Sequence, residues 1–323
     1  MTLPKFSIII PVKPGGELPA LSGIAKATYP CELFELLVAY GCRPSAQRNL
    51  AAREARGEIL YFLDDDSRVD PGFLERAAGH YREAQVAAVG GPSLTPGTDS
   101  ALQRAIGIAF ASPVGGGGVR NRYRKTGSAR RSSDSELILC NLSFRREIFL
   151  SHEGLDERLY PNEENELMDR LQHEGCLLVH DPELAVLRSQ RRTYRAYLKQ
   201  MLGYGRGRGE QTLISGRLKP VSLAPSLFFI YTLLLPFLGG GIYAAPFFCY
   251  LLTIAAASVS GAVSGGDAAL LPRLLVVFPT LHLAYGAGVL WGVAKPRYRR
   301  GGETPREVEV RRLKAFEDAV PNL

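Results

Sequence analysis

Apolar residues in the first half of the chain form short runs of strand type, separated by stretches of helix type. Phe6–Val12, Ile59–Leu63 and residues 34–39 are rich in β-branched and aromatic side chains, as expected of strands buried on both faces of a mostly parallel sheet. Residues 45–56 read as a helix with Ser45 as its N-cap. This β-α-β-α-β order predicts a doubly wound α/β domain, in which ligands bind where the parallel strands end.

The same alternation continues beyond the third strand. It predicts a helix over 71–84, strands over 86–89 and 137–144, a helix over 162–174, a strand over 177–180 and a basic amphipathic helix over 194–204. Residues 113–134 interrupt this pattern with four consecutive glycines at 115–118 and six basic residues. Such a segment is typical of a mobile lid over a site or of a solvated loop, and both interpretations stay open.

The chain changes character at residue 223. Residues 223–265 hold no charged side chain over 43 positions, which is long enough for two membrane-crossing helices with a turn at Gly239-Gly-Gly241. Residues 274–294 are a further candidate. A helix in a soluble core does not need so long an uncharged run. We therefore expect a C-terminal membrane region over 216–296, with two or three transmembrane helices.

The charges beside this region bear on the number of crossings. Arg217 and Lys219 precede the first candidate span, and Lys295 and Arg297 follow the last. Basic residues on both sides favour an even number of crossings with both ends in the cytoplasm, whereas length alone gives three. With an even number, one segment would be re-entrant or interfacial, and residues 223–238, which have a proline near each end, are the candidate.

Composition limits the partners and the compartment. The formal charge of +7 and the pI near 9.2 suit phosphates or anionic lipid headgroups, and no nucleic-acid-binding motif accompanies them. The five cysteines form no CxxC pair, as is typical of reduced thiols. Residues 1–5 lead directly into the first strand pattern without a signal peptide. We expect a catalytic domain on the cytoplasmic face of the cell membrane and a basic, then polar, tail over 297–323.

The most informative polar cluster is Asp64-Asp65-Asp66, at the end of the third predicted strand. Three adjacent carboxylates repel one another unless a cation is bound, and their oxygens suit Mg²⁺ or Mn²⁺ together with a diphosphate. A solvated acidic turn is the alternative. The position at a buried strand end favours a ligand site.

Four segments in this order resemble family 2 glycosyltransferases of the GT-A fold. They are Phe6–Val12, Ser45-Ala-Gln-Arg-Asn49, Gly57-Glu-Ile-Leu-Tyr-Phe-Leu-Asp-Asp-Asp66 and residues 162–171, and the similarity covers about residues 5–210. The C-terminal region, with His282-Leu-Ala-Tyr-Gly286, resembles more loosely that of bacterial enzymes that build exopolysaccharide and other surface glycans. The resemblance implies a Rossmann-like, nucleotide-sugar-binding GT-A domain over 1–215, followed by the helical membrane region.

The resemblance also assigns roles to the strand ends. It implies that Asp64 and Asp65 face the nucleoside and ribose, and that Asp66, with Asp64, holds Mg²⁺ or Mn²⁺ on the donor diphosphate. Such a metal offsets the charge that develops on the departing nucleoside diphosphate. Pro11 and Val12 end the first strand, where the base lies in the family.

The family's catalytic base belongs to a Glu-Asp pair that opens a helix, and Glu163-Glu164 stands at the matching position. A carboxylate there would take the acceptor proton during inverting transfer, and we expect Glu164 to act ahead of Glu163. The alternative is that acidic residues favour a helix N-terminus through the macrodipole. Asn141 is the candidate for acceptor contact, with a strand-end turn as its alternative role.

Three arginines are candidates for contact with phosphate. Arg48 either contacts the donor diphosphate or forms an ion pair on a helix surface. Arg206 and Arg208 belong to Gln200-Met-Leu-Gly-Tyr-Gly-Arg-Gly-Arg208, which resembles a Gln-x-x-x-Tyr-Gly-Arg-Gly segment of the family. Their guanidinium groups would grip the donor diphosphate or a lipid phosphate, or anchor the chain at the membrane surface.

Two departures from the family pattern limit these expectations. Many relatives have acidic residues after the second strand that read the base, whereas this chain has Ala39-Tyr40-Gly41, so that Tyr40 becomes a candidate for stacking on the base. The family's histidine, a third metal ligand, has no clear match near residues 187–189, so water is expected in its place.

The sequence therefore predicts an inverting, metal-dependent transferase that uses a UDP- or GDP-sugar and a lipid-linked or other glycan acceptor at the membrane, in the synthesis of cell-surface glycans. Two other classes stay open. A sugar nucleotidyltransferase shares the nucleotide fold, but the Gly-rich, Arg-containing loop of that class is absent after the first strand. A non-catalytic membrane scaffold in a glycan assembly complex is the third.

Overall fold

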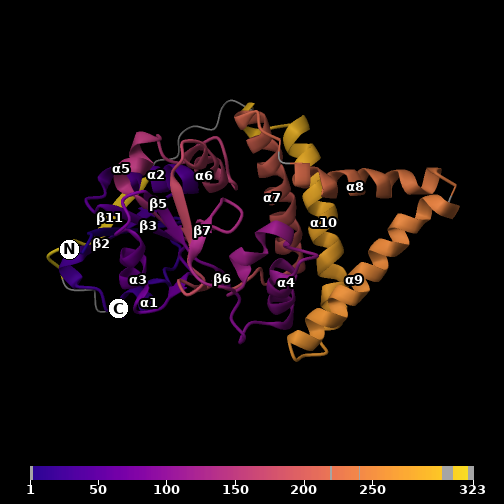
Figure 1. Ribbon diagram of the computed structural model, residues 1–323, viewed down its shortest axis with the longest axis horizontal. Helices are drawn as coiled ribbons and strands as arrows, with labels where there is room; N and C mark the ends of the chain where they lie inside the picture. Colours follow the sequence, from indigo (N-terminus) through magenta and orange to yellow (C-terminus); the bar gives the residue numbers. More distant parts are fainter. Residues whose placement is uncertain (1–2, 219, 240, 300–307, 319–323) are drawn as a thin grey trace. The chain divides into compact units, whose positions relative to one another are not determined.

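The structure is a computed structural model that describes residues 3–218, 220–239, 241–299 and 308–318 (Figure 1). The chain forms two compact units, which are described in turn. The first comprises residues 1–94, 121–188 and 302–323, and the second comprises residues 95–120 and 189–301.

The first unit is built on an eight-stranded sheet with the order β11-β2-β1-β3-β8-β5-β9-β7. The strands are β1 (Phe6–Val12), β2 (Phe34–Tyr40), β3 (Ile59–Leu63), β5 (Val86–Gly90), β7 (Arg130–Ser132), β8 (Asn141–Arg145), β9 (Leu177–His180) and β11 (Glu309–Lys314). β2, β1, β3, β5 and β9 share one direction, while β11, β8 and β7 run antiparallel to their neighbours. The α/β fold predicted from the sequence is confirmed.

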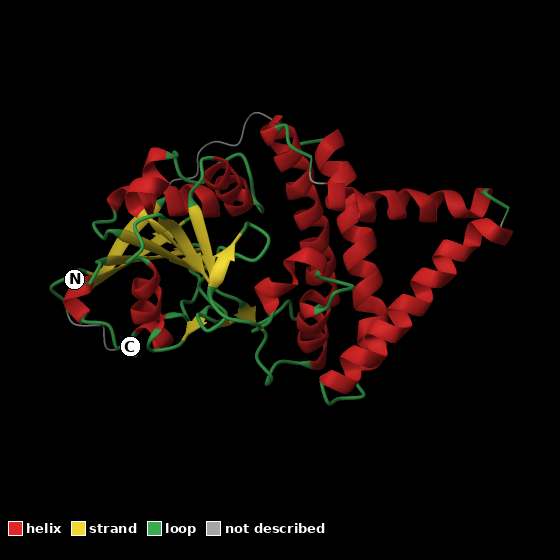
Figure 2. Ribbon diagram, in the orientation of Figure 1, coloured by secondary structure: helices red, strands yellow, loops and turns green. Residues whose placement is uncertain are grey.

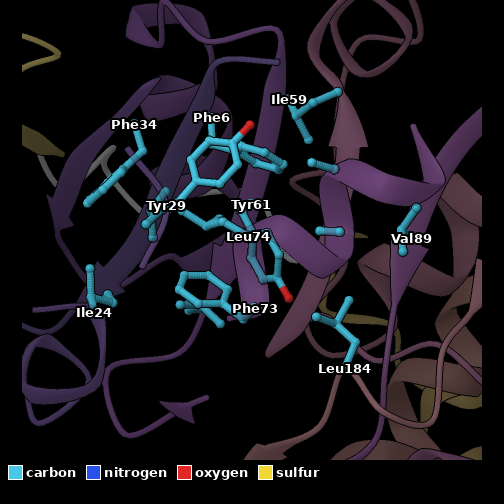
Figure 3. Close-up of a cluster of buried hydrophobic side chains, with 14 of the residues drawn as sticks. Phe6, Ile24, Tyr29, Phe34, Ile59, Tyr61, Phe73, Leu74, Val89 and Leu184 are labelled. Atoms are coloured by element: carbon cyan, nitrogen blue, oxygen red, sulfur yellow. The ribbon is translucent and has the colours of Figure 1, made fainter. Parts of the chain in front are cut away.

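Helices cover both faces of this sheet, as the red segments on either side of the yellow strands show (Figure 2). α1 (Leu21–Ile24) and α3 (Phe73–His80) lie on one face, and α2 (Pro44–Glu54), α5 (Arg146–Ser151) and α6 (Glu163–His173) lie on the other. On the first face Tyr61 packs between the rings of Phe6 and Phe73 (Figure 3). Apolar side chains of the helices pack against both faces of the sheet. The central strands are therefore apolar on both faces, as their sequences predicted.

β11 closes the β2 edge of the sheet with residues that follow the apolar helices. Arg312 forms an ion pair of 2.8 Å with Glu35, which is fully buried, and Lys314 donates hydrogen bonds to the carbonyls of Cys31 and Phe34. The sequence suggested a polar tail here. β11 alternates exposed and covered positions, and its pairing with β2 is a contact between distant residues that local sequence does not show.

The glycine- and arginine-rich segment contains a helical turn and a strand. Residues 117–123 form the helical turn η2 (Gly117–Tyr123), and β7 pairs with β9 at the edge of the sheet. Glu136 binds this part together, because it accepts hydrogen bonds from Arg130, Ser132 and Asn121. These bonds outweigh burial and lower the pKa of Glu136 to about 2. A small sheet of β4 (Arg68–Val69), β10 (Val186–Leu187) and β6 (Ser93–Leu94) completes the unit.

The second unit is helical. It contains α4 (Ala101–Ala111), α7 (Tyr194–Ser215), α8 (Ala224–Leu234), α9 (Ala245–Ser264) and α10 (Leu270–Ala294), with short turns η3 (Pro220–Leu223), η4 (Leu235–Phe237), η5 (Gly241–Ala244) and η6 (Arg297–Arg299). α7 and α10 lie side by side (Figure 1). Their backbones touch at glycines: a Cβ on Gly205 would lie 2.0 Å from the Tyr285 carbonyl oxygen, and one on Gly292 would lie 2.2 Å from that of Arg206. Only glycine permits so close an approach.

Three helical stretches are apolar and long enough to cross a membrane. They are Pro220–Phe237, Gly241–Ser264 and Leu270–Ala294, with 18, 24 and 25 residues. The expected turn at Gly239-Gly-Gly241 separates the first two, although Gly240 lies outside the described residues.

Some local predictions were wrong in detail. Ser45 does not cap α2, because Pro44 opens the helix and the Ser45 hydroxyl donates instead to the Leu159 carbonyl. The strand predicted over 137–144 starts only at Asn141, because residues 137–140 form a buried turn. α7 runs past residue 204 to Ser215, since its glycines serve helix packing.

Candidate active site

The aspartate triplet follows β3 directly, and Arg188 contacts two of its three members. Arg188, next to β10, places Nη2 3.0 Å from Asp64 Oδ2 and Nε 2.7 Å from Asp66 Oδ1. Burial and the two neighbouring aspartates raise the pKa of Asp65. The triplet is therefore the charged cluster at the strand end that the sequence suggested, with a guanidinium group bridging its outer members.

α2 fixes the surroundings of this cluster through three consecutive buried positions, 47–49. Gln47 donates to the carbonyls of Val12 and Ala39 at 3.0 and 2.6 Å, and so joins the ends of β1 and β2. Asn49 forms a reciprocal pair of hydrogen bonds with the backbone of Leu155, in the loop that leads to α6. A single helix thereby connects the two strand ends with the start of α6.

Arg48, from the same helix, joins the aspartates to the glutamate pair. Its Nη2 lies 2.6 Å from Asp64 Oδ1, and its Nη1 lies 3.6 Å from Glu163 Oε1. Its side chain is only 5% exposed. Of the two roles left open by the sequence, a surface ion pair is excluded, because Arg48 is a buried bridge between Asp64 and Glu163.

The glutamate pair opens α6, next to a turn in which Asn162 has a φ of 90°. Glu163 and Glu164 are 2% and 8% exposed, so both carboxyl groups have left most of their water. Burial, followed by the charge of Glu164, raises the pKa of Glu163 to about 8. Glu163 therefore keeps its proton more readily than an exposed glutamate does.

The charge balance of the cluster favours a cation. Three carboxyl groups, at positions 64, 66 and 163, pair with two guanidinium groups, at 48 and 188, and Asp65 and Glu164 add two more carboxyl groups next to them in the chain. Among the residues that the structure describes, no group of three or more His, Cys, Asp or Glu is arranged to hold a metal ion. Asp66 is the most exposed of the ion-paired aspartates, and Arg188 contacts only its Oδ1. A donor set with one or two carboxylates fits Mg²⁺ or Mn²⁺ when a diphosphate supplies further oxygens.

The ends of β1 and β2 hold the residues expected near the base. Pro11 and Val12 pair with Ala39 and Tyr40. Tyr40 is half-buried, and the guanidinium group of Arg311, from β11, lies 5.2 Å from the centre of its ring. One face of the Tyr40 ring is thus already covered by a cation, which is a favourable contact for an aromatic ring.

Asn141 has a role inside the core. It is fully buried, its Oδ1 accepts from the Tyr61 hydroxyl at 2.7 Å, and its Nδ2 donates to the Leu184 carbonyl at 2.5 Å. Both ends of the amide are engaged, so Asn141 positions β8 against its neighbours and exposes no atom to an acceptor. The neighbouring Cys140 is also buried, which raises its pKa to about 11.

Comparison with known proteins bears on this arrangement. Residues 40–150 match the family model described as glycosyl transferase family 2. Residues 40–150 of the chain are thus similar to glycosyl transferase family 2. The match spans the aspartate triplet and Arg48; it agrees with the family resemblance and confirms the enzyme class that the sequence predicted. No curated protein matches the chain.

Solved structures agree on the fold. The chain overlaps the mannosyltransferase PcManGT from Pyrobaculum calidifontis, in complex with GDP-Man and Mn²⁺, with a TM-score of 0.58 and 14% identity, over 92% of this chain and 89% of that one. TarS 1-349 from S. aureus, in complex with UDP-GlcNAc, overlaps with a TM-score of 0.45 and 13% identity over 89% and 91% of the chains. The second overlap is too loose to bear on the fold, and the first supports the GT-A fold of this glycosyltransferase.

Arg206 and Arg208 belong to the helical unit of the glycosyltransferase. The Arg206 guanidinium group lies 4.5 Å from the centre of the Trp291 ring and donates to the Lys295 carbonyl at 2.8 Å. Arg208 donates to Gln211 Oε1 at 2.8 Å. Arg206 thus serves the packing of α7 on α10, and the glycines around it serve the same contact.

Two site residues escaped the sequence analysis. Gln47 carried a signal, since it lies in the Ser45–Asn49 segment that resembles the family, but its hydrogen bonds to two strand ends depend on the register of β1 and β2. Arg188 stands near the position where the family's histidine was sought. It replaces the expected neutral ligand with a permanent cation, because the pKa of an arginine keeps it protonated.

Proposed function

We propose that the chain transfers a sugar, with inversion, from a nucleoside diphosphate sugar to an acceptor at the membrane, in the synthesis of cell-surface glycans. The observation that carries this proposal is the connection of the aspartate triplet to the Glu163-Glu164 pair through the buried Arg48. It supports a donor site and a proton acceptor within one rigid framework, as inverting transfer needs.

Glu164 is the proposed base. Glu163, whose pKa is raised to about 8, holds a proton at neutral pH and also faces Arg48. The remaining carboxylate of the pair then takes the proton of the acceptor hydroxyl while that oxygen attacks C1 of the sugar. A protonated Glu163 also reduces the negative charge that an incoming diphosphate meets.

Asp66, with Asp64, would hold Mg²⁺ or Mn²⁺ on the donor diphosphate. The bound cation would supply Lewis-acid stabilisation of the charge on the leaving nucleoside diphosphate. Arg48 and Arg188 keep Asp64 oriented, and their positive charge reduces the repulsion between the triplet and the diphosphate. The mannosyltransferase solved with GDP-Man and Mn²⁺ makes GDP-mannose the first donor to test, followed by UDP-sugars.

The apolar helices support an acceptor at the membrane. Three candidate spans follow the catalytic unit, and they would keep its site close to the bilayer surface. A lipid-linked sugar fits such a site, because its lipid would hold the sugar at the bilayer surface. The catalytic unit would lie on the cytoplasmic face of the cell membrane.

The test is a thermal-shift screen of the purified protein in detergent with GDP, UDP, CDP and their sugars, with and without Mn²⁺. We expect one nucleoside diphosphate to raise the melting temperature only when Mn²⁺ is present, and Asp66→Ala to abolish the rise. Binding that needs no metal and survives Asp66→Ala would contradict the proposal.

The products of turnover distinguish a glycosyltransferase from a nucleotidyltransferase and from a non-catalytic scaffold. Transfer releases a nucleoside diphosphate and gives a product whose anomeric configuration, read by NMR, is opposite to that of the donor. Glu164→Gln should abolish turnover while the donor still raises the melting temperature. Release of pyrophosphate would indicate a nucleotidyltransferase, and a protein that binds no donor would indicate a scaffold.

A further inference from the structure

The connection of the apolar helices to folded segments determines which of them cross a membrane. β11 follows α10 in the chain and pairs with β2 over five residues of the sheet. Backbone hydrogen bonds of one sheet cannot be formed across a bilayer. The chain before α8 and the chain after α10 therefore lie on the same side of the membrane, here termed the sheet side.

The turn between α9 and α10 is tied to the same side. Arg104 of α4 forms a 3.0 Å ion pair with Asp267 and donates to the Gly265 carbonyl at 2.7 Å. α4 precedes every apolar span, and its chain enters from β6 and returns to β7, both in the sheet unit. Residues 265–267 thus lie on the sheet side, and α10 both begins and ends there.

The far end of α10 is tied down independently. Glu210 of α7 is fully buried, and its carboxylate binds Arg297 at 2.7 Å and Arg206 at 3.2 Å. α7 itself connects the sheet unit to α8, so its residues also lie on the sheet side. Removing one partner of such a buried pair is costly, which makes this contact a firm anchor.

The packing of α10 against α7 leads to the same conclusion. Tyr197 donates to the Val277 carbonyl, and Gly205, Gly209 and Gly288 bring the two backbones into contact further along. α7 carries Arg195, Lys199, Arg206, Arg208 and Glu210 over this length. Each basic residue costs about 2.5–3.5 kcal/mol at the centre of a membrane helix. A bilayer-spanning α10 would draw these charges into the hydrocarbon.

α8 and α9 show the opposite properties. Only 11% of each span is buried, against 50% of the α10 span. No charged residue occurs between Pro220 and Ser264. The two helices contact each other near their turn, where Phe228 and Tyr250 have ring centroids 4.3 Å apart and the Tyr231 hydroxyl donates to the Tyr243 carbonyl. The spans that contain α8 and α9, Pro220–Phe237 and Gly241–Ser264, have 18 and 24 residues and match the roughly 20 residues that a crossing needs.

We propose that α8 and α9 form the membrane-inserted hairpin, that the acyl chains of the bilayer cover it, and that α10 lies at the bilayer surface without crossing. The chain then has two crossings, and the non-crossing helix is α10 instead of residues 223–238. This arrangement places Arg217, Arg273 and Lys295 on one side, as expected for the cytoplasmic face. This topology does not depend on which sugar the protein transfers, because none of the contacts that support it involves the aspartate triplet.

Labelling of single cysteines with a membrane-impermeant maleimide tests the proposal in the full-length protein. The background replaces the exposed cysteines Cys31, Cys42 and Cys249 by serine. New cysteines at exposed positions report on each side: Ile242→Cys at the tip of the hairpin, Ala268→Cys in the α9–α10 turn and Glu317→Cys after β11. Each variant is used only if it elutes from size-exclusion chromatography in detergent as the parent does.

We expect intact cells to label Ile242→Cys, and Ala268→Cys and Glu317→Cys to react only after permeabilisation. Labelling of Glu317→Cys from outside would show three crossings, and labelling of Ala268→Cys from outside would show that α9 and α10 cross. A third result is that the maleimide labels none of the three cysteines in intact cells and that carbonate releases the protein from membranes as a dimer. This result would show that a second copy of the chain covers the hairpin. Each of these three results would overturn the proposal.

Discussion

A chain of four ionisable side chains joins the proposed donor and acceptor functions. Arg188, Asp64, Arg48 and Glu163 contact one another in this order, with closest distances of 3.0, 2.6 and 3.6 Å. A neighbouring guanidinium group favours the charged form of a carboxyl group, whereas burial favours its neutral form. The two arginines thus determine how much negative charge the site presents to a donor.

Arg188→Gln should change the metal requirement of donor binding. Removal of one positive charge beside Asp64 and Asp66 strengthens their attraction for a divalent cation. We expect the Mn²⁺ concentration that half-saturates nucleoside diphosphate binding to fall about tenfold, which corresponds to 1.4 kcal/mol. Calorimetric titration measures it, and Arg192→Gln, which removes an exposed charge nearby in sequence, is the control. An unchanged Mn²⁺ requirement would disprove this role.

Glu163 should make stability depend on pH. Its pKa rises from 4.5 to about 8 on folding, so its protonated form stabilises the fold fully below pH 4.5, and this contribution is lost as the pH rises through 8. Between pH 5 and 8.5 the melting temperature of the parent should fall further than that of Glu163→Gln. The melting temperature is expected to fall by about 2–4 °C for each kcal/mol of unfolding free energy that the parent loses relative to the variant. The exposed Glu147→Gln should follow the parent, and parallel curves for all three proteins would contradict the raised pKa.

At the scale of elements, the contact between α7 and α10 depends on glycines, two of which lie beside the arginines that the sequence made candidates for phosphate contact. Gly205 and Gly209 face carbonyl oxygens of α10, and Gly288 and Gly292 face those of α7. Close backbone approach in both directions gives a contact that larger residues cannot make.

Gly205→Ala should therefore destabilise the helical unit, because its Cβ would lie 2.0 Å from the Tyr285 carbonyl oxygen. Overpacking of this kind costs about 1–3 kcal/mol. Gly203→Ala is the matched control, since nothing lies within 4 Å of its added Cβ and alanine favours a helix by up to about 1 kcal/mol. Thermal unfolding in detergent should show a lower melting temperature only for Gly205→Ala. Equal melting temperatures would mean that the helices can separate at no cost.

The whole molecule shows what a sequence can and cannot reveal. The bounds of β1, β3 and β9 match their predicted ranges, because an apolar run between turn residues is a local signal. The aspartate triplet was recognised from its position at a strand end. The sequence did not predict β11 or the pairing of Arg188 with Asp64. Each of these depends on contacts between segments more than 100 residues apart.

Removal of β11 should weaken the catalytic unit as a whole. A chain that ends after residue 308 exposes the hydrogen-bonding edge of β2 and takes Arg312 away from the buried Glu35. We expect a lower melting temperature and aggregation through the open edge. Size-exclusion chromatography and thermal unfolding measure both, and a chain that ends after residue 318 is the control. A 308-residue chain that behaves like the control would show that β11 adds nothing to the sheet.

The position of β11 also has a consequence for biosynthesis. Tyr40 and its partner Glu309 are separated by 269 positions, so the ribosome finishes the edge of the sheet long after it has started the sheet. At about 5–20 residues per second, the interval is roughly 13–54 s. During this time the hairpin of α8 and α9 emerges and can enter the bilayer, while the edge of β2 is still open. In the proposed topology, the sheet becomes complete only in chains whose α8–α9 hairpin has already been synthesised. The catalytic unit therefore finishes folding after the chain has reached the membrane.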